Sequence, residues 1–227
     1  MRQEFRQHGV DIDRIHLVPL PINTSLPQGI APSERRLRGR ILFVGRLTDL
    51  KGADHLMKAI PQAAEKIGRP LTVTIAGDGP ERTKLRSLAH RLGIEAEFAG
   101  WVQAEQKADL MRQSDLLAVP SLWPEPFALV GIEAGCLGLP AVAYSVGGIP
   151  EWLIPGRSGE LAPGDPPTVE GLAKAIFRAL ADREHHAKLC QGAWEIAMQH
   201  TLDGHLENLE AILEAAKQTP AEYLYPK

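Results

Sequence analysis

Short apolar runs separated by amphipathic helical stretches restrict the fold of this chain more than any other feature. Most of the runs end in glycine or serine, as buried strands of a parallel sheet often do. We expect strands at 41–45, 71–77, 96–100, 115–121, 140–145 and 159–162. We expect helices at 52–66, 81–93, 104–113, 126–137, 149–154, 166–181, 183–199 and 202–216. This alternation predicts an α/β fold, a single Rossmann-like, doubly wound parallel sheet with C-terminal helices.

The first forty residues differ from the rest of the chain. The segment HLVPLPINTSLPQGIAPSERRLRG mixes a short apolar patch, prolines and a basic run, which is typical of a linker. We therefore expect a lead-in at 1–40, a Rossmann-like domain at 41–200, and a C-terminal helix and tail at 201–227.

Composition excludes several classes of function. The chain of 227 residues has 44% apolar and 23% charged residues and a net charge of −3 without a basic block, so nucleic acid and anionic membranes are poor candidates as main partners. It shows no secretory or membrane-spanning segment, and Cys136 and Cys190 lack metal spacing. We expect a soluble cytoplasmic protein with two reduced thiols, no metal, and His185 and His186 on a helix surface.

The stretch WPEPFALVGIE, residues 123–133, sets two carboxylates eight positions apart. If Pro126 opens a helix, Glu125 lies at its mouth and Glu133 about two turns inside, roughly 12 Å along the axis. Carboxylates accept hydrogen bonds from hydroxyls, and free amides at a helix start favour an anion. A nucleotide sugar has both groups. The amides concerned are those of Phe127, Ala128 and Leu129.

Each of these carboxylates also has a plainer interpretation. Glu125 would favour a helix start without any ligand, and Glu133 could lie on a solvent-facing stripe. The helix that carries Glu133 is otherwise apolar, so we favour a functional role for it.

Two cations follow the first predicted strand. Arg46 and Lys51 in GRLTDLKG would form a diphosphate clamp beside helical amides, or belong to a solvated loop. The segment is not a Walker A loop.

Glycine-rich turns follow other strands. GDGP at 77–80 and VGG at 146–148 would either approach a ligand closely or serve only as turns. Trp101 and Trp123 follow strand ends, where they would border a pocket or pack in the core.

Taken together, these segments resemble the C-terminal, donor-binding domain of the retaining GT-B glycosyltransferases, the "glycosyl transferases group 1" family (family 4). The resemblance runs from about residue 15 to about residue 200. Its motifs occur in order: HLVPLPIN, GRLTDLKG, AGDGP, FAGWV, PSLWPEPFALVGIEAGCLGLPAV and YSVGGIPEWLIPGRSGEL. EPFALVGIEAG matches the family's specific E-x7-E motif.

The resemblance implies a role for each matching residue. The loop of Gly45 with Arg46 and Lys51 would hold the diphosphate of a nucleotide sugar, Glu133 the ribose hydroxyls and Glu125 the hydroxyls of the transferred sugar. The amides of Phe127, Ala128 and Leu129 would contact the sugar and the distal phosphate, while Gly77, Gly79 and the turn that ends at Val102 would border the nucleoside. Ala128 departs from the family, which often has glycine there, and its methyl would narrow the room for the sugar.

The resemblance also implies the chemistry, a hexosyl or related glycosyl transfer with retention by front-face displacement. Arg46, Lys51 and Glu125 would be the catalytic residues, the donor is a substrate, and neither cofactor nor metal is expected. Paired carboxylates also occur in glycoside hydrolases. Here Glu125 and Glu133 are expected at different depths, so hydrolysis ranks low.

A full enzyme of this family has a second Rossmann domain that holds most of the acceptor site, and the predicted first strand near residue 41 leaves no room for it. We expect a truncated chain or a half-enzyme that needs this acceptor domain or a partner subunit, with UDP, GDP or ADP in the donor. A peripheral membrane association would come through the missing domain. The alternative is a non-catalytic nucleotide-sugar-binding or regulatory module. The last helix would also allow self-association through an apolar face of Leu206, Leu209, Ile212 and Leu213.

Overall fold

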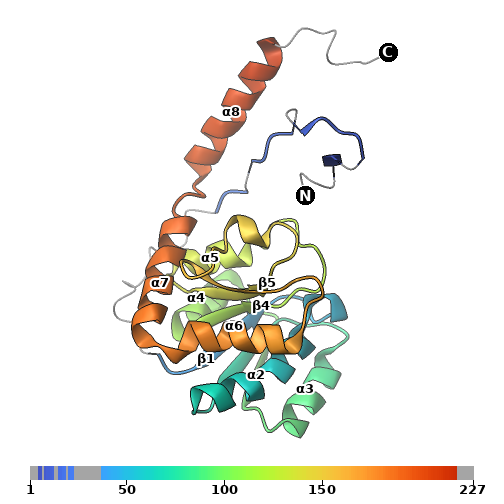
Figure 1. Ribbon diagram of the computed structural model, residues 1–227, viewed down its shortest axis with the longest axis vertical. Helices are drawn as coiled ribbons and strands as arrows, with labels where there is room; N and C mark the ends of the chain where they lie inside the picture. The colour runs from blue at the N-terminus through green and yellow to red at the C-terminus, as the bar shows by residue number, and fades with distance from the viewer. Residues whose placement is uncertain (1–4, 7, 13–14, 19, 23–36, 219–227) are drawn as a thin grey trace.

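The computed structural model describes residues 5–6, 8–12, 15–18, 20–22 and 37–218 (Figure 1). Its centre is a sheet of six parallel strands in the order β3-β2-β1-β4-β5-β6. The strands are β1 (Arg40–Val44), β2 (Thr72–Ala76), β3 (Ala96–Gly100), β4 (Leu116–Val119), β5 (Ala141–Tyr144) and β6 (Gly159–Ala162). The chain moves outward from β1 to β3 and then returns to place β4 beside β1, which makes the carboxyl ends of β1 and β4 the switch point of the fold.

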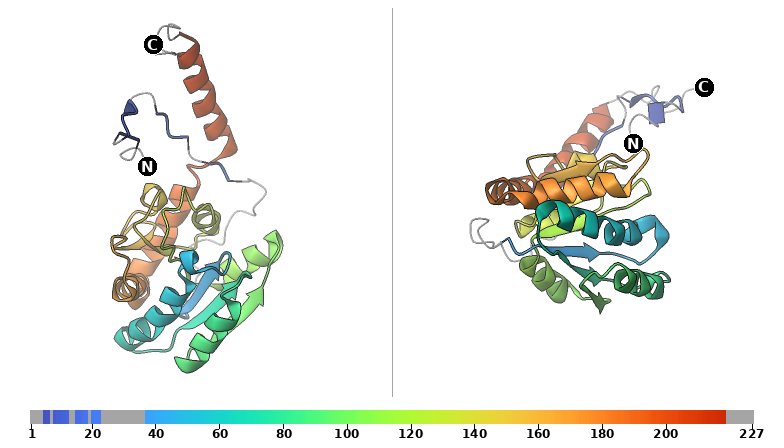
Figure 2. Two further views of the ribbon diagram at one scale, coloured as in Figure 1. Left: turned by 90° about the vertical axis from the view of Figure 1, so that its right-hand side faces the viewer. Right: turned by 60° about the horizontal axis from the view of Figure 1, so that its bottom comes forward.

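Helices cover both faces of the sheet (Figures 1 and 2). One layer is α2 (Ala53–Ile67), α3 (Arg82–Arg91) and α6 (Val169–Ala181), and the other is α4 (Ala104–Gln113), α5 (Val130–Cys136) and α7 (Arg183–Ala197). Alternate residues of β1 divide between two cores: Ile41 and Phe43 pack with the first layer, and Leu42 packs with the second. The predicted doubly wound sheet is therefore confirmed, as are all six strands, to within a residue or two at each end.

The predicted helix at 126–137 is wrong at its start, because α5 begins at Val130. The carbonyl oxygens that a helix from Pro126 would use inside itself have distant partners: Gly148 N–H donates to Glu125 O at 2.7 Å, and the indole Nε1–H of Trp152 donates to Phe127 O at 2.6 Å. Ala128 then adopts a left-handed conformation with φ +61°. The stretch from Ser121 to Ala128 is therefore a loop clamped from behind, and Glu133 lies in the first turn of α5.

The expectation that both histidines lie on a helix surface is wrong for His186. This side chain is 2% exposed, and its Nε2–H donates to the carbonyl oxygen of Asp115 at 2.8 Å. The ring thereby ties α7 to the start of β4. His185 is partly exposed, with Nε2 at 3.0 Å from Glu160 Oε1. Cys136 and Cys190 are both buried, and they form no disulfide.

The last helix leaves the body of the protein. α8 (Leu202–Gln218) projects beyond the sheet, and the described part of the lead-in runs on the same side (Figures 1 and 2). Ile22 is buried, and its N–H donates to the carbonyl oxygen of His200 at 2.9 Å. Leu206, Leu209 and Leu213 on α8 are exposed, with Leu213 at 54%. None of the helices in the described ranges is both long and apolar enough to cross a bilayer.

Candidate functional site

The loops that follow the strands pack directly on one another, and glycines make this possible. A Cβ added at Gly77, after β2, would lie 1.9 Å from the carbonyl oxygen of Gly45, after β1. A Cβ at Gly79 would lie 2.4 Å from the carbonyl oxygen of Leu47, and Gly77 N–H donates to Gly100 O at 2.7 Å. Gly77 and Gly79 therefore have a structural role, because they allow the loop after β2 to pack against the loop after β1 and the end of β3.

A cavity of about 290 Å³ opens at the switch point of the sheet. The ends of β1 and β4 form its floor, which is where doubly wound folds bind ligands. Six of the predicted site residues line it: Gly45, Arg46, Lys51, Glu125, Ala128 and Leu129. The tertiary structure thus brings the two predicted cations, from the loop after β1, together with one predicted carboxylate, from the loop after β4.

Glu125 is the buried charge of this cavity, with a relative exposure of 7%. Its Oε1 accepts hydrogen bonds from the Lys51 ammonium and from the Ser121 hydroxyl, the latter at 2.7 Å. These two hydrogen bonds offset the free-energy cost of burying the Glu125 carboxylate. Its Oε2 accepts no hydrogen bond from any described residue, so it remains available to a ligand hydroxyl.

Lys51 is held in place by its backbone surroundings. It ends the short 3₁₀ helix Asp49–Lys51, and Leu122 N–H donates to Leu50 O at 2.9 Å, which fastens this turn to the loop after β4. Gly52 follows with φ +65°, and a Cβ there would lie 1.9 Å from Pro120 O. The close approach of Gly52 to Pro120 leaves no room for a side chain at position 52. It holds the backbone so that the Lys51 ammonium faces Glu125.

Arg46 differs from Lys51 in that its side chain is exposed and makes no ion pair with any residue that the structure describes. Two cations therefore line one cavity, one committed to a carboxylate and one free. Because Glu125 offsets the charge of Lys51, the net positive charge of the cavity comes from Arg46 and favours an anionic ligand.

Backbone donors complete the site. The amides of Phe127, Ala128 and Leu129 donate no hydrogen bond within the described part of the chain, although they belong to the loop before α5 and not to a helix from Pro126. Ala128 and Leu129 line the cavity, whereas the Phe127 side chain is buried in the core. The loop is clamped from behind because Gly148 packs on the backbone of Pro126.

Glu133 lies outside the cavity and has its own partner. Its Oε2 accepts a hydrogen bond from the Lys107 ammonium on α4 at 2.7 Å. The pair is partly buried, with side-chain exposures of 22% for Lys107 and 28% for Glu133. Burial, and secondarily the nearby Glu133 carboxylate, raise the pKa of the Cys136 thiol to about 11.

The remaining predicted residues are placed as follows. Val102 is partly buried against the core beneath α4. Trp101 and Trp123 are 76% and 50% exposed, so the alternative of core packing is wrong for both. Sequence reasoning missed two side chains: Ser121, whose position four residues before Glu125 was the available signal, and Lys107, for which the sequence held none.

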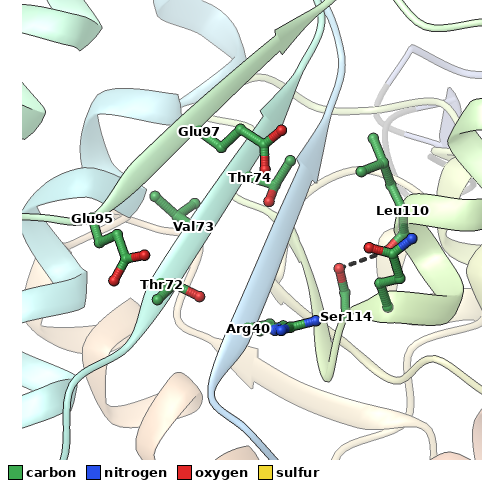
Figure 3. A pocket seen from close by; sticks show the side chains of 9 residues that line it. Arg40, Thr72, Val73, Thr74, Glu95, Glu97, Leu110 and Ser114 are labelled. Carbon is green, nitrogen blue, oxygen red and sulfur yellow. Dashed lines mark hydrogen bonds between the residues drawn. The ribbon is translucent and has the colours of Figure 1, made fainter.

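A second cavity of about 300 Å³ lies at the opposite edge of the sheet (Figure 3). Thr72 and Thr74 on β2 and Glu97 on β3 line it, beside Arg40 at the start of β1. It faces the amino ends of the strands, on a polar part of the sheet face next to α4. Ligands of parallel sheets bind at the carboxyl ends, so we assign the site to the first cavity.

Comparison with known proteins identifies the family of this chain. The model of the family "Glycosyl transferases group 1" matches residues 34–195. A D-inositol 3-phosphate glycosyltransferase of Xylanimonas cellulosilytica is 32% identical over 232 residues, which are 95% of this chain and 55% of the relative. The corresponding protein of Salinispora arenicola is 34% identical over 237 residues, 98% of this chain and 51% of the relative. The chain thus spans about half the length of these curated relatives.

Solved structures show the same fold. The crystal structure of Anabaena Alr3699/HepE in complex with UDP and glucose superposes with a TM-score of 0.75 at 25% identity, covering 96% of this chain and 61% of that protein. The six-stranded parallel sheet corresponds to one Rossmann-like half of the GT-B glycosyltransferase fold. With the matched family model spanning the whole sheet and its site, the chain belongs to the glycosyl transferases group 1 family.

Proposed function

We propose that this chain binds a nucleotide-diphosphate sugar and acts as the donor-binding part of a retaining glycosyltransferase. The observation that carries the proposal is the convergence of Arg46, Lys51, Glu125 and the unpartnered amides of residues 127–129 at the switch point of the sheet. Cations and amides suit a diphosphate, and a carboxylate oxygen without a partner suits a sugar hydroxyl. The solved structures of HepE contain UDP and UDP-glucose, which makes UDP the first nucleotide to test.

The proposed reaction needs no nucleophile from the protein. The bond between the anomeric carbon and the diphosphate oxygen breaks, the acceptor oxygen attacks the same face, and its proton passes to the departing diphosphate. Negative charge grows on the leaving diphosphate in this step. Arg46 and Lys51 would stabilise that charge, and Lys51 would do so from a fixed position, because it is already ordered by Glu125 and need not reorganise.

Acceptor binding is proposed for residues outside these 227, because the matched relatives are about twice as long as the chain. Binding of the donor is therefore proposed for this chain, and transfer only for its assembly with an acceptor domain or partner subunit. The exposed stripe of Leu206, Leu209 and Leu213 on α8 also supports our earlier hypothesis of self-association. A strictly monomeric species in light scattering at high concentration would contradict self-association.

Calorimetric titration with UDP, GDP and ADP, and then with UDP-glucose, tests the donor proposal. We expect binding of at least one nucleotide, and a loss of about 10- to 100-fold in affinity in Arg46→Ala because a charge-assisted contact disappears. Arg91→Ala, which removes an exposed arginine at the end of α3, is the matched control and should bind as the wild type does.

Two outcomes would overturn the proposal. Failure of all three nucleotides to bind would exclude a nucleotide-sugar site. Binding that survives Arg46→Ala combined with Glu133→Ala would show that the site lies elsewhere. Release of glucose from UDP-glucose, measured with and without an acceptor domain, separates a donor domain of an enzyme from a binding module.

A further inference from the structure

The ion pair between Lys107 and Glu133 lies at the ligand edge of the sheet but outside the 290 Å³ cavity. Lys107 is in the first turn of α4, after β3, and Glu133 is in the first turn of α5, after β4. In a parallel α/β fold, the helices that follow strands begin at the carboxyl edge, where ligands bind. The pair therefore joins the two helix starts that border this edge.

The backbone around Lys107 is rigid at this point. Gln103 caps α4 in a reciprocal arrangement, in which its side chain accepts from the backbone of Gln106 and the Gln106 side chain accepts from Gln103 N–H at 3.2 Å. Lys107 N–H also donates to Gln103 O at 2.8 Å. The lysine stem therefore starts from a fixed position.

Glu133 has one oxygen committed and one available. Its Oε2 accepts from Lys107 at 2.7 Å, while its Oε1 accepts no hydrogen bond from the residues that the structure describes. The rest of α5 is largely buried, so Glu133 is the charged side chain that this helix presents at its start. A carboxylate held by one oxygen is an oriented acceptor for a hydroxyl at the other.

We propose that Lys107 is a positioning residue for the nucleoside, which orients Glu133 so that Oε1 accepts a ribose hydroxyl. This inference rests on the proposed donor function and adds a specificity element that the chain's motifs do not contain. Without Lys107, the side chain of Glu133 would turn freely and would have to be ordered when the nucleotide binds. That ordering lowers affinity by about three- to tenfold.

The competing interpretation is an ion pair that only joins two helices, since partly exposed pairs contribute little on their own. The two interpretations differ in what they predict for a ligand without ribose hydroxyls. A positioning residue affects only the ligand that carries the hydroxyls, whereas a structural pair affects both ligands alike or neither of them.

The test is calorimetry with UDP and with 2′,3′-dideoxy-UDP on the wild type, Lys107→Met, Lys107→Arg and Glu133→Gln. We expect Lys107→Met to weaken UDP by about three- to tenfold and to leave the dideoxy analogue unchanged. Lys107→Arg keeps the cation and should retain most of the preference for UDP over the dideoxy analogue. Adding Lys107→Met to Glu133→Gln should cause no further loss, because the lysine acts through the glutamate.

Lys188→Met is the matched control, because Lys188 pairs with Glu184 at 2.9 Å on the exposed face of α7. It should change neither affinity. The positioning role would be overturned if Lys107→Met weakened the affinity for both ligands equally, left the preference for UDP over the dideoxy analogue unchanged, or tightened UDP binding. The donor proposal would remain intact in each case. If the wild type binds none of UDP, GDP and ADP, the donor proposal fails and this inference fails with it.

Discussion

Replacing Ala128 by glycine should make the protein more stable. Among the described residues, Ala128 is the one non-glycine residue with a positive φ, at +61°. A left-handed conformation costs an L-residue with a Cβ about 1–2 kcal/mol. Glycine avoids this strain but loses about 0.5–1 kcal/mol more in conformational entropy on folding. The difference leaves a net stabilisation of about 0.5–1 kcal/mol for Ala128→Gly.

Urea and thermal unfolding measure this effect directly. A gain of this size in a domain of about 200 residues corresponds to a rise in Tm of about 1–4 °C. The matched control is Ala187→Gly, since Ala187 is exposed inside α7 and has ordinary helical geometry. The same chemical change should there destabilise the protein by about 1 kcal/mol. If both substitutions destabilise to the same extent, the strain at Ala128 is absent and our account of the loop before α5 is wrong.

Three further predictions concern the surroundings of this loop. Gly147→Ala should destabilise by about 2 kcal/mol or more in urea unfolding, because φ is +57° and the new Cβ would lie 2.1 Å from Glu125 O; a near-wild-type free energy of unfolding would contradict the clamp. Cys136, with a thiol pKa raised to about 11, should resist a thiol reagent in the native protein at mildly alkaline pH and react fully in urea. Burial lowers the pKa of His200 below 6.5, so the folded state binds fewer protons and stability should fall as pH drops below that value; His200→Gln should flatten this slope, and an unchanged slope would assign it to other groups.

Strands and most helices of this fold were predictable because their signals are local. The run ILFVG lies between two polar segments and is buried on both faces, so apolar residues fill it regardless of which helix finally covers each face. The predicted bounds of the strand at 159–162 and of the helix at 104–113 likewise agree with β6 and α4. The convergence of Arg46, Lys51 and Glu125 followed from the rule that ligands meet the carboxyl ends of parallel strands.

The start of α5 was not predictable in the same way. Pro126 is a suitable first residue of a helix, and nothing near it in sequence opposes a helix. The competing hydrogen bonds come from Gly148 and Trp152, more than twenty residues further along the chain. They engage the carbonyl oxygens of Glu125 and Phe127, so the helix begins only at Val130 and the spacing of the two carboxylates is not a helical one.

Local pattern therefore decided where the strands and most helices of this chain lie, and their alternation predicted the doubly wound sheet and the edge at which we propose a ligand site. Periodicity depends on neighbours in sequence, and these neighbours are the same in any fold. The tertiary structure alone decided the partners: Glu125 with Lys51 and Ser121 in the cavity, Glu133 with Lys107 outside it, and His186 of α7 with the carbonyl oxygen of Asp115. A buried charge or polar ring needs a hydrogen-bond partner, and the packing of distant segments decides which residue that partner is. The local sequence around the buried residue therefore does not identify it.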